Sequence, residues 1–401
     1  MTTDLPPPTL STLQAALAGS GAAFRLRTRL QPVGGPGDKV FPPTYAEAQD
    51  AKKNTNQTTN YATENRVIDG EHKPSVLLDS VASQANRMEL ALLHARRRGE
   101  LRLPLCTVDF TPEFPELGTI SALQAPHRVY DAILRDSTLD GTAFRASEVG
   151  RRLTDASPSD ARAMLEHCPT ALVFGAWDST GPRGGMGHKF QRTLVSEVVG
   201  IGFLPGTKVG SRIDPIQSAK AVSLVVPKGA PDQWSIDETG KSKQRPSDAN
   251  HSNIPPTRDE ESGGVTVEYA LHTAVLSLPA LRRLRFGDWD DAKTSAAHTL
   301  LAALGLLAIA LQRREGYDFR SRCTLVPEAP ASLELVSADG TVEPFSLTVD
   351  QARALYSAAL EHALAAGIPW AEDELVLRPM PKLVQLIRAS QEHLRVSGTA
   401  D

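Results

Sequence analysis

The stretch that decides the fold is AAFRLRTRL, residues 22–30, in which apolar and basic side chains alternate. The side chains on one face are Phe24, Leu26, Thr28 and Leu30. The opposite face carries Arg25, Arg27 and Arg29. Alternation with a period of two residues predicts a half-buried β-strand. Its three guanidinium groups form either a solvated sheet surface or a surface that faces phosphates.

Helical and strand patterns follow one another along the rest of the chain. Residues 75–98 predict a helix with Ser75 as its N-cap, and the apolar stripe of this helix is Leu77, Val81, Ala85, Met88 and Leu92. Further helices are predicted at 190–199, 292–314 and 349–366. Strands are predicted at 171–177, 219–226, 265–278 and 375–377, and a hairpin at 333–336 and 342–347. Strands separated by helices predict an α+β domain, in which helices pack on a sheet.

Three segments interrupt this pattern and predict insertions in a single domain of residues 1–401. Residues 34–74 include a polar stretch, 45–70, that has almost no large aliphatic side chains and cannot build a core alone. Residues 111–169 predict a compact helical subdomain. Residues 227–264 hold prolines, glycines and mixed charges, and predict a flexible or partner-bound insertion.

The charge of the chain is nearly balanced, because 43 basic and 47 acidic side chains give a formal net charge of −4. A protein that coats nucleic acid nonspecifically usually has a basic excess. The balance therefore argues against a DNA-coating protein but permits a narrow basic groove. Aromatic residues make up only 5% of the chain, which argues against base stacking as the main source of affinity.

The cysteines and the apolar segments indicate the cellular compartment of the protein. The chain has three cysteines and no CxxC pair, which excludes a cysteine-rich zinc site and indicates a reducing compartment. Residues 1–10 are polar and proline-rich, unlike a signal peptide. The longest apolar run, residues 300–311, is shorter than the ~20 residues of a membrane span, so a buried core helix is expected. We therefore expect a cytoplasmic protein with no membrane partner.

The segment most relevant to function is WDSTGPRGGMGHKFQR, residues 177–192. Its four glycines allow close approach of the backbone to a ligand and leave amide groups free for anions. Arg183, His188, Lys189 and Arg192 add charge that is positive or becomes so on protonation, and the helix predicted next would point its positive end at the same place. The spacing matches neither the P-loop nor the dinucleotide-binding motif. The alternative is a tight glycine turn that joins a strand to a helix.

Signs of catalysis are weak. His188 beside Lys189 has the chemistry for acid–base catalysis of RNA cleavage, and Asp178 has the chemistry for holding a metal near a phosphate. A single aspartate at a strand end is more often a turn former, however. The ten histidines are scattered, and no HExxH, GxSxG or Cys–His signature occurs. The sequence therefore predicts no catalytic residue, no metal and no cofactor.

Three blocks resemble a known family: NTNQTTNYATENRVIDG (54–70), LLDSVASQANRMELAL (77–92) and VFGAWDSTGPRGGMGHKFQRTLVSEVVGIG (173–202). In order, spacing and approximate chain length they are similar to the RAMP-superfamily backbone subunit of the type I-G (formerly I-U) Cascade complex of CRISPR systems. The resemblance spans most of the chain, but residues after 227 match only loosely.

The resemblance implies an antiparallel sheet similar to an RNA-recognition motif, or ferredoxin-like, with helices on one face and large insertions. It implies a non-catalytic crRNA-binding subunit of an antiviral ribonucleoprotein. Copies of such a subunit polymerise as a helical filament along the guide and present it for pairing with a target DNA strand. A thumb-like hairpin from each copy displaces bases at intervals. Further implied partners are the Cascade large subunit, the guide-processing subunit and a recruited helicase-nuclease.

The assignments of individual residues to the guide RNA are hypotheses. The helix residues expected to contact it are Ser83, Asn86 and Arg87. The residues of the glycine-rich segment expected to do so are Ser179, Arg183, Gly184, Gly185, Lys189 and Arg192. Further candidates in the polar stretch are Lys52, Lys53, Asn54 and Arg66. The thumb is expected in residues 45–70 or in residues 202–219.

Two other functions stay open. One is a RAMP-family endoribonuclease that processes the guide RNA, with His188 or Asp178 as its catalytic residue. The other is an enzyme that binds a small phosphorylated molecule through the glycine-rich segment.

Overall fold

The computed structural model describes residues 5–45, 59–181 and 188–397. Its main sheet is antiparallel and has the strand order β18-β19-β1-β17-β10-β3-β2, with a further hairpin, β20-β21, paired to β1. The strands of this sheet are β1 (Gly21–Pro32), β2 (Thr63–Ile68), β3 (Glu71–Asp79), β10 (Leu194–Ile201), β17 (Tyr269–Ser277), β18 (Tyr317–Asp318), β19 (Thr324–Pro327), β20 (Leu333–Ser337) and β21 (Val342–Phe345).

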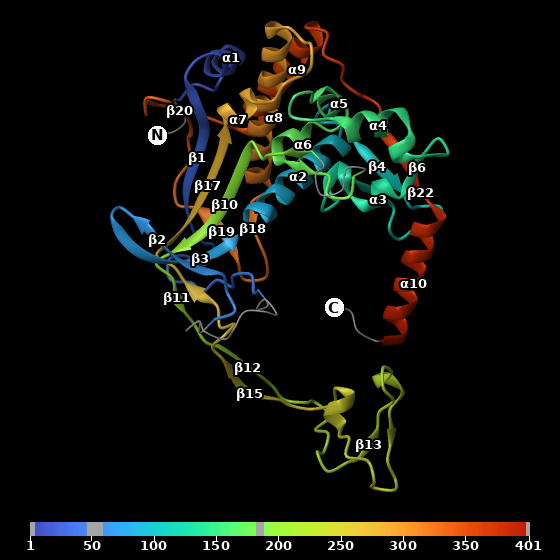
Figure 1. Cartoon of the computed structure of the whole chain (residues 1–401). Helices are drawn as coiled ribbons and strands as arrows, with labels where there is room; N and C mark the ends of the chain where they lie inside the picture. The colour runs from blue at the N-terminus through green and yellow to red at the C-terminus, as the bar shows by residue number, and fades with distance from the viewer. Residues whose placement is uncertain (1–4, 46–58, 182–187, 398–401) are drawn as a thin grey trace.

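The centre of the sheet has the ferredoxin-like arrangement. Strands β1, β10, β17 and β19/β20 come in this order along the chain. In the sheet they lie in the order β19/β20, β1, β17, β10, which is the 4-1-3-2 order of a ferredoxin-like sheet. Helix α2 (Val81–Arg97) lies between the first and second of these strands in the chain, after the hairpin β2-β3, and helix α8 (Asp291–Glu315) lies between the third and the fourth. Both pack on the same side of the sheet, together with α1 (Leu10–Ala18), α7 (Leu278–Arg282) and α9 (Val349–Ala365) (Figure 1). The predicted α+β sheet with helices on one face is confirmed.

Helix α8 is the centre of the hydrophobic core. Residues Ala296–Gln312 are buried on all sides of the helix. By length and composition α8 is apolar enough to cross a membrane, but 89% of its most apolar window is buried inside the protein. The expected core helix around residues 300–311 is therefore confirmed.

Strand β1 has the burial pattern that its sequence predicts. Phe24 and Leu26 are fully buried under the helices, and Leu30 is fully buried in a second cluster of strand and loop residues, whereas the three arginines lie on the opposite, open face of the sheet. On that open face, Arg25 pairs with Glu334 at 2.7 Å, and the Arg29 guanidinium lies 4.0 Å from the centre of the Tyr269 ring. Arg27 is exposed and forms no hydrogen bond or ion pair within the described ranges.

The helix predicted from Ser75 begins later than expected. Residues 75–79 belong to β3, which pairs with both β2 and β10. The N-cap is Ser80, whose hydroxyl accepts a hydrogen bond from the Ser83 amide. The prediction was wrong here because a strand runs into a helix without a glycine or proline between them. The polar stretch 45–70 also contains β2, which turns into β3 at Asp69 and Gly70, both with positive φ as a two-residue hairpin turn requires.

Two predictions around the glycine-rich segment were wrong. Residues 169–174 form helix α6 (Pro169–Phe174), and only β8 (Ala176–Trp177) is extended there. Residues 190–199 do not form a helix: after β9 (Lys189–Phe190) the chain enters β10, which lies between β17 and β3 in the sheet. The β-branched residues of β10 suit a central strand. The glycine-rich segment is therefore not followed by a helix whose positive end could attract an anion.

The later predictions are mostly confirmed. The strand at 265–278 is β16 (Val265–Thr266) and β17, the hairpin is β20-β21, the helix at 349–366 is α9, and the strand at 375–377 is β22 (Leu375–Pro379). Residues 219–226 were predicted as a strand, but only β13 (Leu224–Val225) is extended. Helices α1 and α10 (Pro381–Ser397) were not predicted.

The insertion between α2 and β10 is a mixed subdomain rather than a helical one. Its sheet has the order β5-β4-β22-β6-β7, so the C-terminal strand β22 completes it. Its strands are β4 (Cys106–Asp109), β5 (Thr119–Ser121), β6 (Ser137–Leu139) and β7 (Thr142–Ala143). Its helices are α3 (Ala132–Arg135), α4 (Glu148–Asp155), α5 (Arg162–His167) and α6, with short turns η1 (Arg128–Tyr130) and η2 (Phe144–Ala146).

A long ribbon projects from the sheet between β10 and β17 (Figure 1). It consists of the pairs β11 (Leu204–Pro205) with β16 and β12 (Lys208–Arg212) with β15 (Ile254–Asp259). Beyond β12 and β15 the chain forms a small lobe, residues 213–253. The lobe contains β13, β14 (Ser235–Ile236), η3 (Pro231–Gln233) and η4 (Pro246–Ala249). Among the described residues, none of positions 209–258 belongs to a hydrophobic core cluster.

A buried chain of hydrogen bonds joins the sheet to α2. His272 of β17 is fully buried, with Nε2 2.9 Å from the Ser196 hydroxyl and Nδ1 3.1 Å from the Tyr317 hydroxyl. The Ser196 hydroxyl donates to Gln84 Oε1 at 2.9 Å. The Ser196 oxygen therefore accepts the proton of His272 Nε2, and the neutral imidazole satisfies the chain. Burial lowers the pKa of His272 from its ordinary 6.5 to about 3.

The burial of His272 predicts that the folded protein loses stability in mild acid. Below about pH 6.5 the unfolded chain binds a proton at His272 that the folded protein takes up only near pH 3. The contribution of neutral His272 to the free energy of unfolding is therefore complete above pH 6.5, and it falls by ~1.4 kcal/mol per pH unit below that value. Between pH 7 and pH 5, the unfolding free energy of His272→Gln should fall by about 2 kcal/mol less than that of the wild-type protein. Urea unfolding at both pH values measures this, and equal pH dependence in both proteins would contradict it.

Candidate nucleic-acid interface

A cavity of about 520 Å³ lies where the insertion meets the sheet. We call it the Trp177 pocket. Its lining residues come from the start of η1 and the two residues before it, the end of α6, strands β8 and β9, the link from β9 to β10, and the start of β10. They are Pro126, His127, Arg128, Phe174, Gly175, Ala176, Trp177, Lys189, Phe190, Gln191, Arg192 and Val195.

Gly175 and the two short paired strands, β8 and β9, position the side chains of the pocket. Gly175 ends α6 with φ +83, and a Cβ there would lie 3.0 Å from both the Phe190 carbonyl oxygen and Arg192 Cγ. This turn allows β8 to pair antiparallel with β9, so that Trp177 lies opposite Lys189. The Lys189 Nζ is 5.8 Å from the centre of the indole ring, and the Trp177 side chain remains 48% exposed.

A buried ion pair supports the floor of the pocket. The Arg128 guanidinium donates to both oxygens of Glu89, at 2.6 and 2.8 Å, and to the Gly175 carbonyl oxygen at 3.1 Å. Glu89 belongs to α2 and is 1% exposed. Burial raises the pKa of Glu89, while the positive charges of Arg128 and Arg192 act against that rise. The pair connects α2 to the pocket and neutralises Arg128.

The free positive charge of the pocket comes from Lys189 and Arg192. Both are exposed, and neither forms an ion pair with a residue in the described ranges. A half-exposed indole beside two unpaired cations is a combination that suits single-stranded nucleic acid, since cations attract phosphates and aromatic rings stack on bases.

The predicted guide-contacting residues fall in separate places. Lys189 and Arg192 line the Trp177 pocket, and Ser179 is exposed two residues beyond Trp177. Asn86 is exposed on α2, one turn before Glu89. Arg183, Gly184 and Gly185 lie outside the described residues, as do Lys52, Lys53 and Asn54.

Three predicted residues use their donors within the protein. The Ser83 hydroxyl donates to Asp79 Oδ1 at 2.6 Å. Arg87 donates to Asp79 Oδ2 at 3.1 Å and to the Phe319 carbonyl oxygen at 2.9 Å. Arg66 lies at the other edge of the sheet and pairs with Glu197 at 2.7 Å. These contacts give Ser83, Arg87 and Arg66 structural roles in addition to any contact with a ligand.

The groups considered for catalysis also have structural partners. Asp178 is buried, and its Oδ1 accepts a hydrogen bond from Arg145 at 2.7 Å. Arg145 also donates to the Thr180 carbonyl oxygen at 3.2 Å, so the pair closes the turn after β8. The His188 carbonyl oxygen accepts from the Asp178 amide. Within the described ranges, no group of three His, Cys, Asp or Glu side chains is arranged to hold a metal ion.

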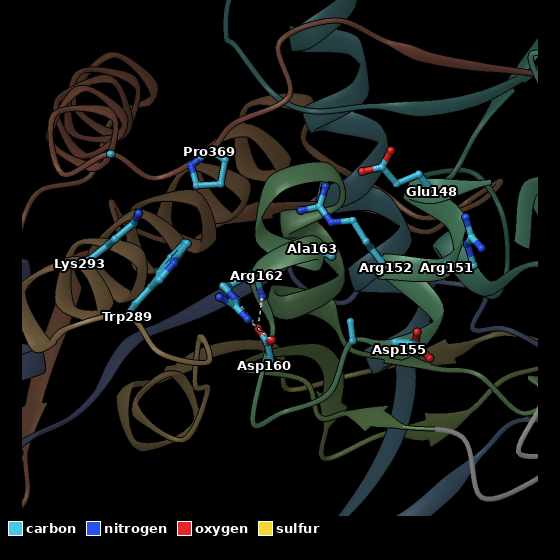
Figure 2. Close-up of a pocket in the computed structure, with 12 residues that line it drawn as sticks. Glu148, Arg151, Arg152, Asp155, Asp160, Arg162, Ala163, Trp289, Lys293 and Pro369 are labelled. Atoms are coloured by element: carbon cyan, nitrogen blue, oxygen red, sulfur yellow. Dashed lines mark hydrogen bonds and ion pairs between the residues drawn. The ribbon is translucent and has the colours of Figure 1, made fainter. Parts of the chain in front are cut away.

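A larger cavity, of about 880 Å³, lies between α4, α5 and the start of α8 (Figure 2). It also contains cations, but two of the four, Arg152 and Arg162, are in ion pairs. Arg162 binds both oxygens of Asp160, Arg152 pairs with Glu166, and Lys293 lies 4.5 Å from the centre of the Trp289 ring. With Glu148 and Asp155 on its wall, this cavity is close to neutral and is a poorer site for an anion than the Trp177 pocket.

Sequence reasoning missed Trp177, Arg128 and Glu89 as parts of the site. Trp177 had a signal, since it stands at the end of an apolar run beside the glycine-rich segment. The pair of Glu89 and Arg128 had none, because 39 positions separate them in the chain.

The fold is of the α+β, ferredoxin-like class, and the pocket places an exposed aromatic ring beside two basic side chains. Residues 24–204 match the family model described as CRISPR-associated protein GSU0053 (Cas_GSU0053). This range runs from β1 to β11 and contains the whole Trp177 pocket. No curated protein matches the chain. The family match indicates a CRISPR-associated protein.

The ion pair under the pocket makes a prediction for stability. Arg128→Ala should lower the free energy of unfolding by about 3–5 kcal/mol, because it leaves the buried Glu89 carboxylate without a partner. Combining it with Glu89→Gln should recover part of the loss. Urea unfolding at pH 7 measures both. Arg151→Ala, at an exposed arginine, serves as the control and should change stability by less than about 0.5 kcal/mol. An equally small effect of Arg128→Ala would show that the ion pair does not stabilise the folded protein.

Proposed function

We propose that this protein is a non-catalytic guide-RNA-binding backbone subunit of a CRISPR surveillance complex of type I-G. The observation that carries the proposal is the Trp177 pocket, with its two unpaired cations, on a ferredoxin-like sheet within the matched range. Other copies of the chain, the target DNA strand, the large and guide-processing subunits and a helicase-nuclease are the partners that the proposal includes.

The open face of the sheet supports contact with the RNA backbone rather than base reading. In an RNA-recognition motif, aromatic side chains of this face stack on bases. Here the described residues of β1, β10 and β17 present arginines, aliphatic side chains, a glutamate and the hydroxyl groups of Thr273 and Ser277 on it. The one aromatic ring there, Tyr269, is 9% exposed and lies beneath Arg29. A subunit that leaves sequence recognition to base pairing needs no such platform.

The near-neutral charge of the chain also supports a repeated subunit. Copies that stack along one guide approach each other closely, and a strong basic excess would make them repel. A local pair of cations at each pocket provides phosphate contacts without this penalty.

The double variant Lys189→Ala with Arg192→Ala should weaken binding of a single-stranded guide RNA. Each phosphate contact in single strands contributes about 0.7 to the slope of log affinity against log salt. The slope should therefore fall by about 1.4 in a filter-binding titration over a range of salt concentrations. The charge-matched control is Arg151→Ala with Arg283→Ala, two exposed arginines away from the pocket.

An unchanged slope would remove Lys189 and Arg192 from the interface. The RNA recovered from each titration should keep its length on a denaturing gel. Specific cleavage that His188→Ala abolishes would instead favour the endoribonuclease alternative.

We also propose that the ribbon β12-β15 and its lobe form the thumb of the subunit. Of the two ranges considered for the thumb, the described part of 45–70 contributes β2, which folds back along the sheet, whereas 202–219 enters the projecting ribbon (Figure 1). The lobe also keeps large apolar side chains exposed, among them Ile213, Ile216 and Ile236 at 62–80%. Such a surface is stabilised when a partner covers it.

Shortening the ribbon tests this assignment. Lys208 and Asp259 face each other across the ribbon, so an Asn-Gly turn can replace residues 209–258. Because the described part of this segment lies outside the core clusters, thermal unfolding should stay close to that of the full chain. The shortened protein should bind one site on RNA but fail to form a multi-copy complex on a long guide in size-exclusion chromatography. Assembly equal to that of the full chain would contradict the assignment.

A further inference from the structure

We infer that the Trp177 pocket holds one unpaired base of the bound RNA, stacked on the indole of Trp177. This inference rests on the proposed RNA-binding function and assigns the pocket a ligand, a single nucleotide within a strand. The base lies on the ring, and Lys189 and Arg192 contact the phosphates on either side of it.

The environment of Trp177 is unusual for so large an apolar side chain. It belongs to none of the hydrophobic clusters of the protein, and it is 48% exposed. Its neighbours Phe174 and Phe190, by contrast, are buried at 1% and 2% exposure. Gly175 and the β8-β9 pair hold the backbone of Trp177 in place, so the indole is presented to solvent from a fixed support. Fixed and exposed aromatic rings are the stacking platforms of proteins that bind single strands.

The contact between Lys189 and the ring leaves room for a base. Their separation of 5.8 Å is close to the outer limit of ~6 Å for a cation–π contact. At an exposed site this contact is weak, and it is easily exchanged for stacking. The ammonium group would then be free to pair with a phosphate of the same nucleotide.

The dimensions and the lining of the pocket suit one planar base. A volume of about 520 Å³ lies within the ~300–1,000 Å³ of typical small-ligand sites. The polar side chains at its rim, His127 and Gln191, are exposed. Exposed side chains can adapt to different donors and acceptors, so the pocket accepts a base of any kind. This fits a guide whose sequence varies.

The test compares Trp177→Ala and Trp177→Phe with the wild-type chain, using a single-stranded oligoribonucleotide. Loss of stacking should weaken binding on the order of 10-fold in Trp177→Ala, with an unchanged salt slope because no phosphate contact is removed. Trp177→Phe keeps a flat ring and should retain most of the affinity. An oligomer of the same length with abasic ribose units should bind wild type and Trp177→Ala equally.

Fluorescence gives a second readout. RNA should quench the tryptophan emission of the wild-type protein, and the quenched fraction should be smaller in Trp177→Phe. Thermal unfolding should confirm that both variants are folded, as expected for a side chain outside the core.

The test distinguishes failure of the stacking inference from failure of the proposed function. If the wild-type protein binds RNA with the salt dependence that Lys189 and Arg192 produce, but Trp177→Ala binds equally well and shows the same quenching, the stacking inference is overturned and the proposed function stands. If the wild-type protein binds no RNA, both fail.

Discussion

The burial of helix α8 is the constraint on which the architecture depends. Seventeen consecutive residues, Ala296–Gln312, lie inside the protein, and a helix that is buried on every side must be covered on every side. The sheet covers one side, and α1, α2, α6 and α9 pack around the rest. The helices therefore gather on one face of the sheet, and the arginines of β1 remain on the other. Because α6 also ends at Gly175, the same packing positions the Trp177 pocket.

Elements with a long, regular pattern could be predicted from the sequence. The alternation of β1 and the continuous apolar run of α8 determine their structure almost locally. Residues 190–199 could not be predicted in this way, because a strand there depends on pairing with β17, about 75 positions later. The start of α2 was misplaced for a related reason: Ser75 and Ser80 are both acceptable caps, and only the pairing of β3 with its neighbours selects Ser80.

The candidate site was predictable to the extent that its charges are neighbours in the chain. Lys189 and Arg192 stand within one basic, glycine-rich segment, which is why they were singled out. Ser83 and Arg87 looked equally suitable on a helical face, but their donors are satisfied by Asp79, which the misplaced helix start had hidden. The ion pair of Glu89 with Arg128 joins two distant segments, and such a contact becomes visible only in three dimensions.

The parallel pairing of β22 with β4 has a consequence for biosynthesis. Leu375 lies beside Cys106, so the small sheet of the insertion cannot be completed until the ribosome has translated some 270 further codons. Until then the nascent chain exposes an unpaired edge of β4, which is a template for association with other chains. Non-local pairings of this kind are slow to form. The lag between the synthesis of β4 and that of β22 is thus an interval in which a growing chain benefits from molecular chaperones.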